Sequence, residues 1–225
     1  MDRLEKVDFR LLSGRLAPSE GRLLLLALEY AVLFFGLPAV LWFGVLRLPQ
    51  MTLLYIFTAV ALAALVWDRH FDRRGLYSLA AWRKEALPLL FRFAIAAGVM
   101  TLVMALRHAD ELFLFATSRP QVLGRILIMY ALMSALPQEI IYRAYFFNRY
   151  APLFPGRWLL VANVAAFVAL HVIYLNWLAV VLTIPAGIIF AQTYQRTRSL
   201  PLVALEHALY GGWIFTVGLG IYFVN

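Results

Sequence analysis

Long apolar runs dominate the sequence, and they decide what kind of molecule the chain can form. A helix that crosses a bilayer needs about 20 predominantly apolar residues, and seven runs come close to that length. The expected spans are 22–46, 51–67, 87–106, 121–149, 158–174, 177–194 and 202–223. We therefore predict an all-α fold: a polytopic transmembrane helical bundle of about seven spans, within a range of six to eight.

Composition excludes several other classes of protein. Hydrophobic residues make up 64% of the chain and charged residues only 14%, whereas soluble domains carry about 25% charged residues. The net charge of +8 comes from basic residues in short loops, as in membrane orientation signals, so no nucleic-acid partner is expected. The absence of cysteine excludes disulfides, thiolate metal sites and a cysteine nucleophile.

The chain is predicted to hold one domain behind a short lead. Residues 1–21 mix charges with apolar side chains and are expected to form an amphipathic, juxtamembrane segment. Residues 22–225 show no linker or internal repeat and are predicted to form a single transmembrane bundle. The basic connections fall on one side if the spans alternate, which favours a cytoplasmic N-terminus in a bacterial inner membrane. These connections are the N-terminus and residues 68–84, 149–157 and 195–200.

The fourth run contains polar residues that a lipid-facing helix would not carry. Gln138, Glu139 and Arg143 follow Pro137, which removes a backbone N–H from the helix. A charged group at the bilayer centre costs about 2.5–3.5 kcal/mol or more, so such residues pair with each other or mark a functional site. Glu139 and Arg143 are four residues apart, on one face of a helix, and are expected to form an ion pair.

Two later apolar runs carry polar residues at a similar depth. The fifth run contains His171, and the seventh contains the adjacent pair Glu206 and His207. With a helix rise of about 1.5 Å per residue, Glu139 lies roughly 15 Å, His171 roughly 20 Å and His207 roughly 10 Å from the cytoplasmic ends. These depths agree within helix tilt, so the three groups are predicted to meet.

Glutamate and histidine in a membrane cavity suit hydrolysis by an activated water. A buried carboxylate can serve as general base, while one imidazole orients the water and another stabilises an oxyanion. Arg143 would hold the carboxylate in place. Two alternatives stay open: a structural polar seam that ties helices together, and a zinc site formed by two His and one or two Glu. No close-spaced ligand motif is present, so no cofactor is expected and zinc remains the alternative.

Three short motifs resemble one known family. The first reads Gln138-Glu139-Ile-Ile-Tyr-Arg143, the second runs from Phe167 to His171, and the third runs from His207 to Gly211. Their order and spacing resemble the CPBP family of CAAX prenyl endopeptidases and bacteriocin-processing enzymes, also called Abi. The resemblance covers about residues 121–215, which would form the catalytic core. It implies an all-helical bundle and glutamic-type intramembrane proteolysis.

The resemblance also assigns roles to residues. Glu139 and Arg143 fall on the second Glu and the Arg of the family's first motif. His171 falls on the water-activating His and His207 on the oxyanion-stabilising His. The catalytic candidates are therefore Glu139, His171, His207, Arg143 and Glu206, with Gln138, Phe167 and Gly211 in support.

The sequence departs from the family pattern at two positions. Gln138 stands where the family has its water-activating Glu, and Gly211 stands where it often has Asn. Either Glu139, with or without Glu206, takes over the role, or the site is impaired; we favour an active Gln-Glu variant. Gly211 and Gly212 would permit close backbone approach or a local break in the helix, and an exposed amide there could replace the lost Asn donor.

The leading hypothesis is an intramembrane endopeptidase that cleaves a membrane-tethered protein tail or leader. Its partners would be the lipid bilayer and that substrate. A non-enzymatic alternative is an immunity or scaffold protein that has kept the fold and lost catalysis, which Gln138 supports. A third hypothesis is a proton-coupled transporter, although the chain lacks the paired inverted repeats of many such proteins.

Overall fold

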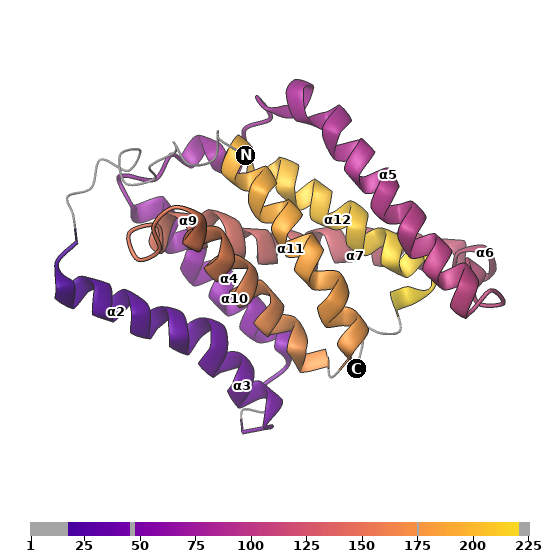
Figure 1. Cartoon of the computed structure of the whole chain (residues 1–225), viewed down its shortest axis with the longest axis horizontal. Helices are drawn as coiled ribbons and strands as arrows, with labels where there is room; N and C mark the ends of the chain where they lie inside the picture. Colours follow the sequence, from indigo (N-terminus) through magenta and orange to yellow (C-terminus); the bar gives the residue numbers. More distant parts are fainter. Residues whose placement is uncertain (1–17, 46–47, 175, 221–225) are drawn as a thin grey trace.

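The chain forms a bundle of helices joined by short turns. A computed structural model describes residues 18–45, 48–174 and 176–220, and these residues contain no strand (Figure 1). Six of the helical segments described are long and apolar enough to cross a membrane, and Arg157–His171 is a shorter apolar helix. The all-α polytopic bundle of about seven spans is thereby confirmed. Most of the predicted lead, residues 1–17, lies outside the described residues.

Two of the described spans are compound, because three short π-helical turns join their α-helical parts. The elements are α2 (Glu20–Ala31), η1 (Val32–Gly36), α3 (Leu37–Trp42), α4 (Gln50–Trp67), η2 (Arg73–Leu76), α5 (Trp82–Arg107), α6 (Leu114–Ser118), α7 (Pro120–Tyr130), η3 (Ala131–Ala135), α8 (Leu136–Glu139), η4 (Ile140–Tyr145), α9 (Phe146–Arg149), α10 (Arg157–His171), η5 (Val172–Tyr174), α11 (Trp177–Thr197) and α12 (Leu200–Val217). Here η1, η3 and η4 are π-helical, whereas η2 and η5 are 3₁₀ turns.

Two of the π turns end two residues before a proline. Pro38 lies in the first turn of α3, after η1, and Pro137 lies in the first turn of α8, after η3. A proline in a helix has no N–H to donate and its ring crowds the carbonyl four residues earlier. The wider π turn relieves this conflict while the helix continues. The first span therefore accommodates Pro38 through a local change of helix type.

Several helix boundaries differ from those expected from hydropathy. Helix α5 begins at Trp82 rather than near residue 87, because its first turn carries charged residues that favour helix without adding apolar character. Helix α12 begins at Leu200, where Ser199 caps it through a hydrogen bond to the Leu202 N–H, and it ends at Gly218 in a left-handed conformation (φ 103°). The last predicted residues of that span, 221–223, lie outside the described part of the chain.

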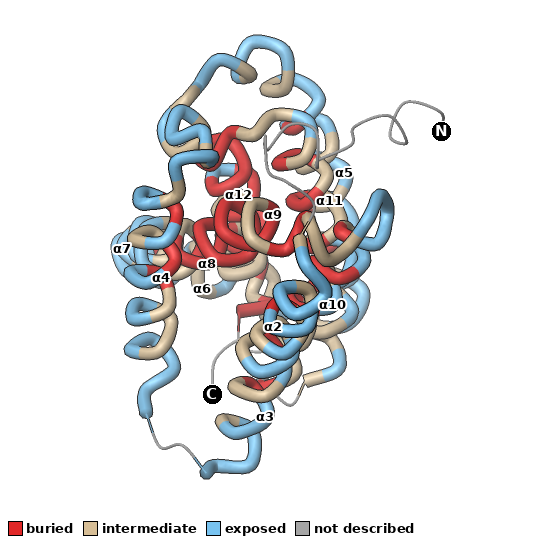
Figure 2. Tube along the Cα trace, turned by 90° about the vertical axis from the view of Figure 1, so that its left-hand side faces the viewer, coloured by how far each residue is buried: buried red, intermediate tan, exposed pale blue. Residues whose placement is uncertain are grey.

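Apolar side chains cover the outside of the bundle. Trp67, Leu87 and Leu106 are each more than three-quarters exposed. Figure 2 shows that buried residues concentrate in α8, α9 and α12, whereas the outer helices are largely exposed. A protein in water seldom leaves so much apolar surface uncovered. The arrangement is that of an integral membrane protein with its most tightly packed region around the fourth and last spans.

The three basic connections of the described chain lie together at one end of the bundle. Asn148 donates to Asp68 Oδ2 across 2.9 Å, and Ser199 Oγ donates to the Ser78 carbonyl across 2.6 Å. Glu29 of α2 joins the same end by accepting hydrogen bonds from Arg149 and Tyr150. Burial raises the pKa of the Tyr150 hydroxyl, so the group stays protonated and donates. These contacts support the expectation that the basic loops share one side of the membrane.

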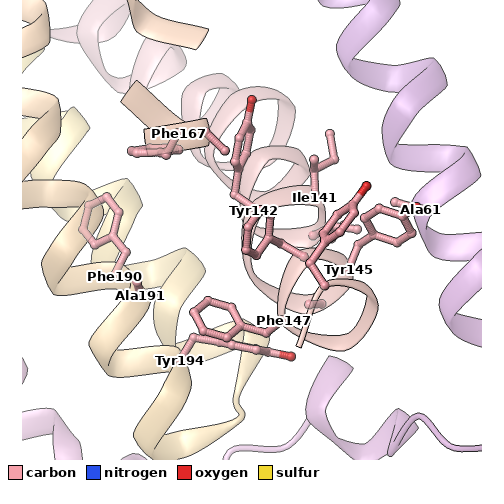
Figure 3. Packing of buried hydrophobic residues seen from close by; sticks show 14 of the residues in the cluster. Ala61, Ile141, Tyr142, Tyr145, Phe147, Phe167, Phe190, Ala191 and Tyr194 are labelled. Carbon is pink, nitrogen blue, oxygen red and sulfur yellow. The ribbon is translucent and has the colours of Figure 1, made fainter. Parts of the chain in front are cut away.

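Aromatic rings fill the interior around η4. Figure 3 shows Tyr142 and Tyr145 on this turn, with Ala61 of α4 on one side and Phe190 of α11 on the other. Tyr142 packs edge-on against Phe167 of α10, with ring centroids 5.3 Å apart. The π turn therefore contacts α4, α10 and α11, and it fixes the position of the polar residues that flank it.

Candidate active site

The polar residues of the fourth span lie in the most deeply buried stretch of the chain. Residues 137–147 are all buried, so this stretch is surrounded by protein rather than by lipid. Glu139 and Arg143 each have 0% exposure, and Gln138 has 6%. A helix that is buried on every side must satisfy its polar groups within the bundle. The partners of these groups therefore define the site.

Glu139 connects the fourth span to the last. One carboxylate oxygen, Oε1, lies 2.8 Å from His207 Nδ1, and Oε2 lies 3.2 Å from Arg143 Nε. The expected ion pair with Arg143 and the expected approach of His207 are both present. An ionised carboxylate only accepts hydrogen bonds, so His207 donates through Nδ1–H.

Arg143 has partners on several sides. Its Nη1 donates to Asn163 Oδ1 across 3.1 Å, and Asn163 in turn donates to the Tyr142 carbonyl. The guanidinium also lies over the Phe167 ring, 4.7 Å from its centroid. A buried cation is tolerated when an acid, a hydrogen-bond acceptor and an aromatic face surround it. Sequence reasoning missed Asn163, although it is an isolated polar residue in an apolar run.

His171 ends helix α10 beside the same group of rings. Its Nδ1 lies 2.8 Å from the Phe167 carbonyl oxygen, and the two rings are 4.7 Å apart. A carbonyl oxygen can only accept, so Nδ1 carries the proton and Nε2 carries the lone pair. The backbone contact therefore defines the tautomer of His171.

A cavity of about 390 Å³ brings these elements together. Its wall includes residues from α4, α7, α8, α10, α11 and α12, and most of it is apolar. Gln138, His171 and His207 line the cavity together with Phe167 and Gly211. Glu139, Arg143 and Glu206 are not among the described residues that line it. The histidines face the cavity, and the acid lies behind one of them.

Glu206 points to a different part of the bundle than its neighbour His207. It is fully buried and pairs with Arg92 of α5 across 3.0 Å, while Arg92 also donates to Thr193 of α11. Adjacent helical residues diverge by about 100°, so only one of the two can face the cavity. The structure does not bring Glu206 to the other candidates. Arg92, an isolated arginine in the third span, was not anticipated.

Gln138 and Gly211 contribute to the cavity wall in different ways. The Gln138 amide donates to Ser134 Oγ across 2.9 Å. A Cβ added to Gly211 would lie 2.1 Å from the Tyr130 hydroxyl oxygen, so the glycine allows this ring to approach. Helix α12 runs unbroken through Gly211 and Gly212. The close approach at Gly211 is made by a side chain rather than by backbone, and the local break was a wrong alternative, because the Tyr130 ring packs against an intact helix.

The described residues do not form the set of ligands that the zinc alternative requires. Among the described residues, no group of three or more His, Asp or Glu side chains is arranged to hold a metal ion. Both oxygens of Glu139 already face nitrogen atoms, one of them on the cationic Arg143. A tetrahedral site requires several donors directed at one open point.

Comparison with known proteins identifies the segment that contains this cavity. Residues 120–213 match the model of the family described as type II CAAX prenyl endopeptidase Rce1-like. This segment is similar to that family and makes up less than half of the chain. The match includes every candidate residue from Gln138 to Gly211. No curated protein and no solved structure matches the chain. The match supports a function of the CAAX protease kind.

Proposed function

We propose that the protein is an intramembrane endopeptidase that hydrolyses a peptide bond in a membrane-tethered protein tail or leader. One observation supports this most directly: two buried histidines line a cavity of about 390 Å³ inside a membrane bundle. Water and a stretch of extended peptide fit a cavity of this size, and its apolar wall suits a hydrophobic tail.

The surrounding contacts favour catalysis over a purely structural seam. A seam needs polar groups that hydrogen-bond to each other across helices. Here the His171 ring bonds to the backbone of its own helix and lines the cavity. His207 is held by Glu139 on one edge and is stacked against Phe190, with centroids 4.8 Å apart. Fixed imidazoles on a cavity wall are typical of acid–base sites.

Gln138 is the observation that favours a second candidate, a catalytically impaired immunity or scaffold protein of the same fold. A carboxamide cannot act as a base at the position where the family has its water-activating Glu. The scaffold reading predicts a phenotype that depends on surface residues and is indifferent to His171.

Co-expression with a panel of membrane-tethered reporter tails separates the two candidates. The wild type is expected to release a tail fragment from at least one reporter, and His171→Ala is expected to abolish the release while inserting normally. His108→Ala, a loop histidine, serves as the matched control. Release that persists in His171→Ala, or no release from any reporter, would overturn the proposed protease.

A further inference from the structure

We propose that His207 is the general base of this site and that Glu139 is a positioning residue that holds it. This assignment rests on the proposed peptide hydrolysis and distributes its tasks among the residues. It differs from the role expected for Glu139 from sequence, because the structure shows where the carboxylate lies relative to the cavity.

Glu139 is shielded from the place where water and substrate would meet. Its side chain has 0% exposure and does not contribute to the cavity wall. One oxygen contacts His207 Nδ1 and the other contacts Arg143 Nε. A general base must come within about 2.6–3.2 Å of the proton that it removes. Both oxygens of Glu139 already have a nitrogen within about that distance, one on His207 and one on Arg143.

His207 lies between the carboxylate and the cavity. Because Nδ1–H donates to Glu139, the opposite ring nitrogen, Nε2, is the basic atom of the neutral ring. The ring stacks on Phe190 and meets Phe167 edge-on, with centroids 5.7 Å apart. Glu139 thus selects the tautomer of His207, fixes the plane of its ring and stands ready to pair with the imidazolium that forms.

His171 is suited to orient the water rather than to act alone. Its Nδ1–H donates to the Phe167 carbonyl, so its Nε2 is also an acceptor. A water that donates one hydrogen to each imidazole presents its lone pair to a peptide carbonyl. The Tyr130 hydroxyl, packed on Gly211 one helical turn beyond His207, lies on the same wall as a hydrogen-bond donor for the carbonyl oxygen.

The bond changes then balance without a further reactant. The water oxygen bonds to the carbonyl carbon while His207 Nε2 takes a water proton, and the carbonyl π electrons move to oxygen. When this oxyanion collapses, the C–N bond breaks and the leaving nitrogen takes the proton from His207. The products are a carboxylic acid and an amine, and His207 returns to its starting tautomer.

Nitrogen NMR of the histidines tests the assignment in the complete protein without any substrate. The chain has four histidines, and a His70→Asn, His108→Asn background leaves only the two in the cavity wall. We expect both rings as Nδ1–H tautomers in ¹⁵N-histidine-labelled protein in bilayers. Glu139→Gln should shift the His207 Nδ1 signal and leave that of His171 unchanged. The double variant Glu139→Gln, Arg143→Met repeats the test without leaving an unpaired buried cation.

Cleavage of a reporter tail by the same variants supplies the second measurement. Glu139→Gln keeps an acceptor for His207 and should lower the rate about tenfold, the difference between a charged and a neutral acceptor. His207→Ala should lower it by about 10²–10⁴-fold, the usual contribution of a general base.

A His207 signal that Glu139→Gln leaves unchanged, or cleavage lost as completely in Glu139→Gln as in His207→Ala, would overturn this assignment alone. A wild type that cleaves no reporter would overturn the proposed function, and the general-base role with it.

Discussion

Single side chains determine whether the buried charge of Arg143 is tolerated. Asn163 supplies the acceptor for Nη1, and Phe167 supplies the aromatic face below the guanidinium. Removal of one partner leaves part of a charged group buried without compensation. Such losses cost more than the original contact contributed, because the group cannot return to water.

Asn163→Leu is expected to destabilise the protein by about 1–3 kcal/mol, since Arg143 Nη1 and the Tyr142 carbonyl each lose one partner and keep only the long 3.4 Å contact with each other. Asn163→Asp keeps the acceptor for Arg143 and should cost less. Thermal or denaturant unfolding in detergent micelles measures both variants. A leucine variant as stable as the wild type would show that Asn163 does not support the arginine.

Gly211→Ala is expected to displace Tyr130 and reduce cleavage, because the new methyl carbon would lie 2.1 Å from the hydroxyl oxygen. Overpacking of this kind costs about 1–3 kcal/mol. Gly124→Ala is the matched control, since a Cβ there meets nothing within 4 Å. Tyr130→Ala in the same chain should restore the stability of Gly211→Ala. If stability stays low in the double variant, the loss has another cause.

The sequence predicted that several polar residues meet inside the bundle, but it did not predict their orientation. Counting residues along each helix placed Glu139 and His207 at one level, and the structure joins them within hydrogen-bonding distance. The same count could not show that Glu206 turns toward α5. Rotation about a helix axis in a bundle that is apolar all round depends on packing partners such as Arg92, and these partners come from distant parts of the chain.

At the scale of the elements, ion pairs fix how the helices face each other. Arg92 and Glu206 form an ion pair that joins α5 to α12. Glu206 directly precedes His207 in α12. Arg92 is 28% exposed and Glu206 is fully buried. The pair therefore influences the rotation of α12 without contacting the cavity.

Arg92→Leu leaves Glu206 without its cation and is expected to destabilise the protein by up to about 3–5 kcal/mol, with partial exposure of Arg92 lowering the cost. The double variant Arg92→Leu, Glu206→Leu should recover most of this loss, because no buried charge is left alone. Unfolding in micelles gives the coupling energy of the pair. Strictly additive losses would show that the two side chains do not depend on each other.

Hydropathy predicted that the membrane-spanning helices exist. It did not predict their π turns or where each helix begins. The apolar runs predicted the spans because each must satisfy its backbone within a helix. The π turns before Pro38 and Pro137 and the early start of α5 at Trp82 have no hydropathy signal. They depend on how a helix accommodates a proline and on the helix preference of charged residues.

For the whole molecule, the position of the basic loops indicates how the bundle is oriented in the membrane. The connections near Asp68, Arg149 and Ser199 meet at one end of the bundle. Loops rich in Lys and Arg stay on the cytoplasmic side. We propose that this end, and the N-terminus with it, faces the cytoplasm.

Because the chain has no native cysteine, single introduced cysteines report this orientation without background. In intact bacterial cells, a membrane-impermeant maleimide is expected to label Asp110→Cys and to leave Arg74→Cys unlabelled until the membrane is opened. Both positions are exposed in the structure. Labelling of Arg74→Cys in intact cells would reverse the proposed topology and leave the site itself unaffected.

The most direct test of catalysis by the cavity histidines is imidazole rescue of His207→Ala in the purified protein, reconstituted with a cleavable reporter tail. The cavity has a volume of about 390 Å³, and removal of the His207 ring enlarges it. Added imidazole can therefore enter and accept the proton of the attacking water. His207→Ala should be inactive, and imidazole should restore part of the cleavage in proportion to its concentration. Undiminished cleavage by His207→Ala without imidazole would contradict it.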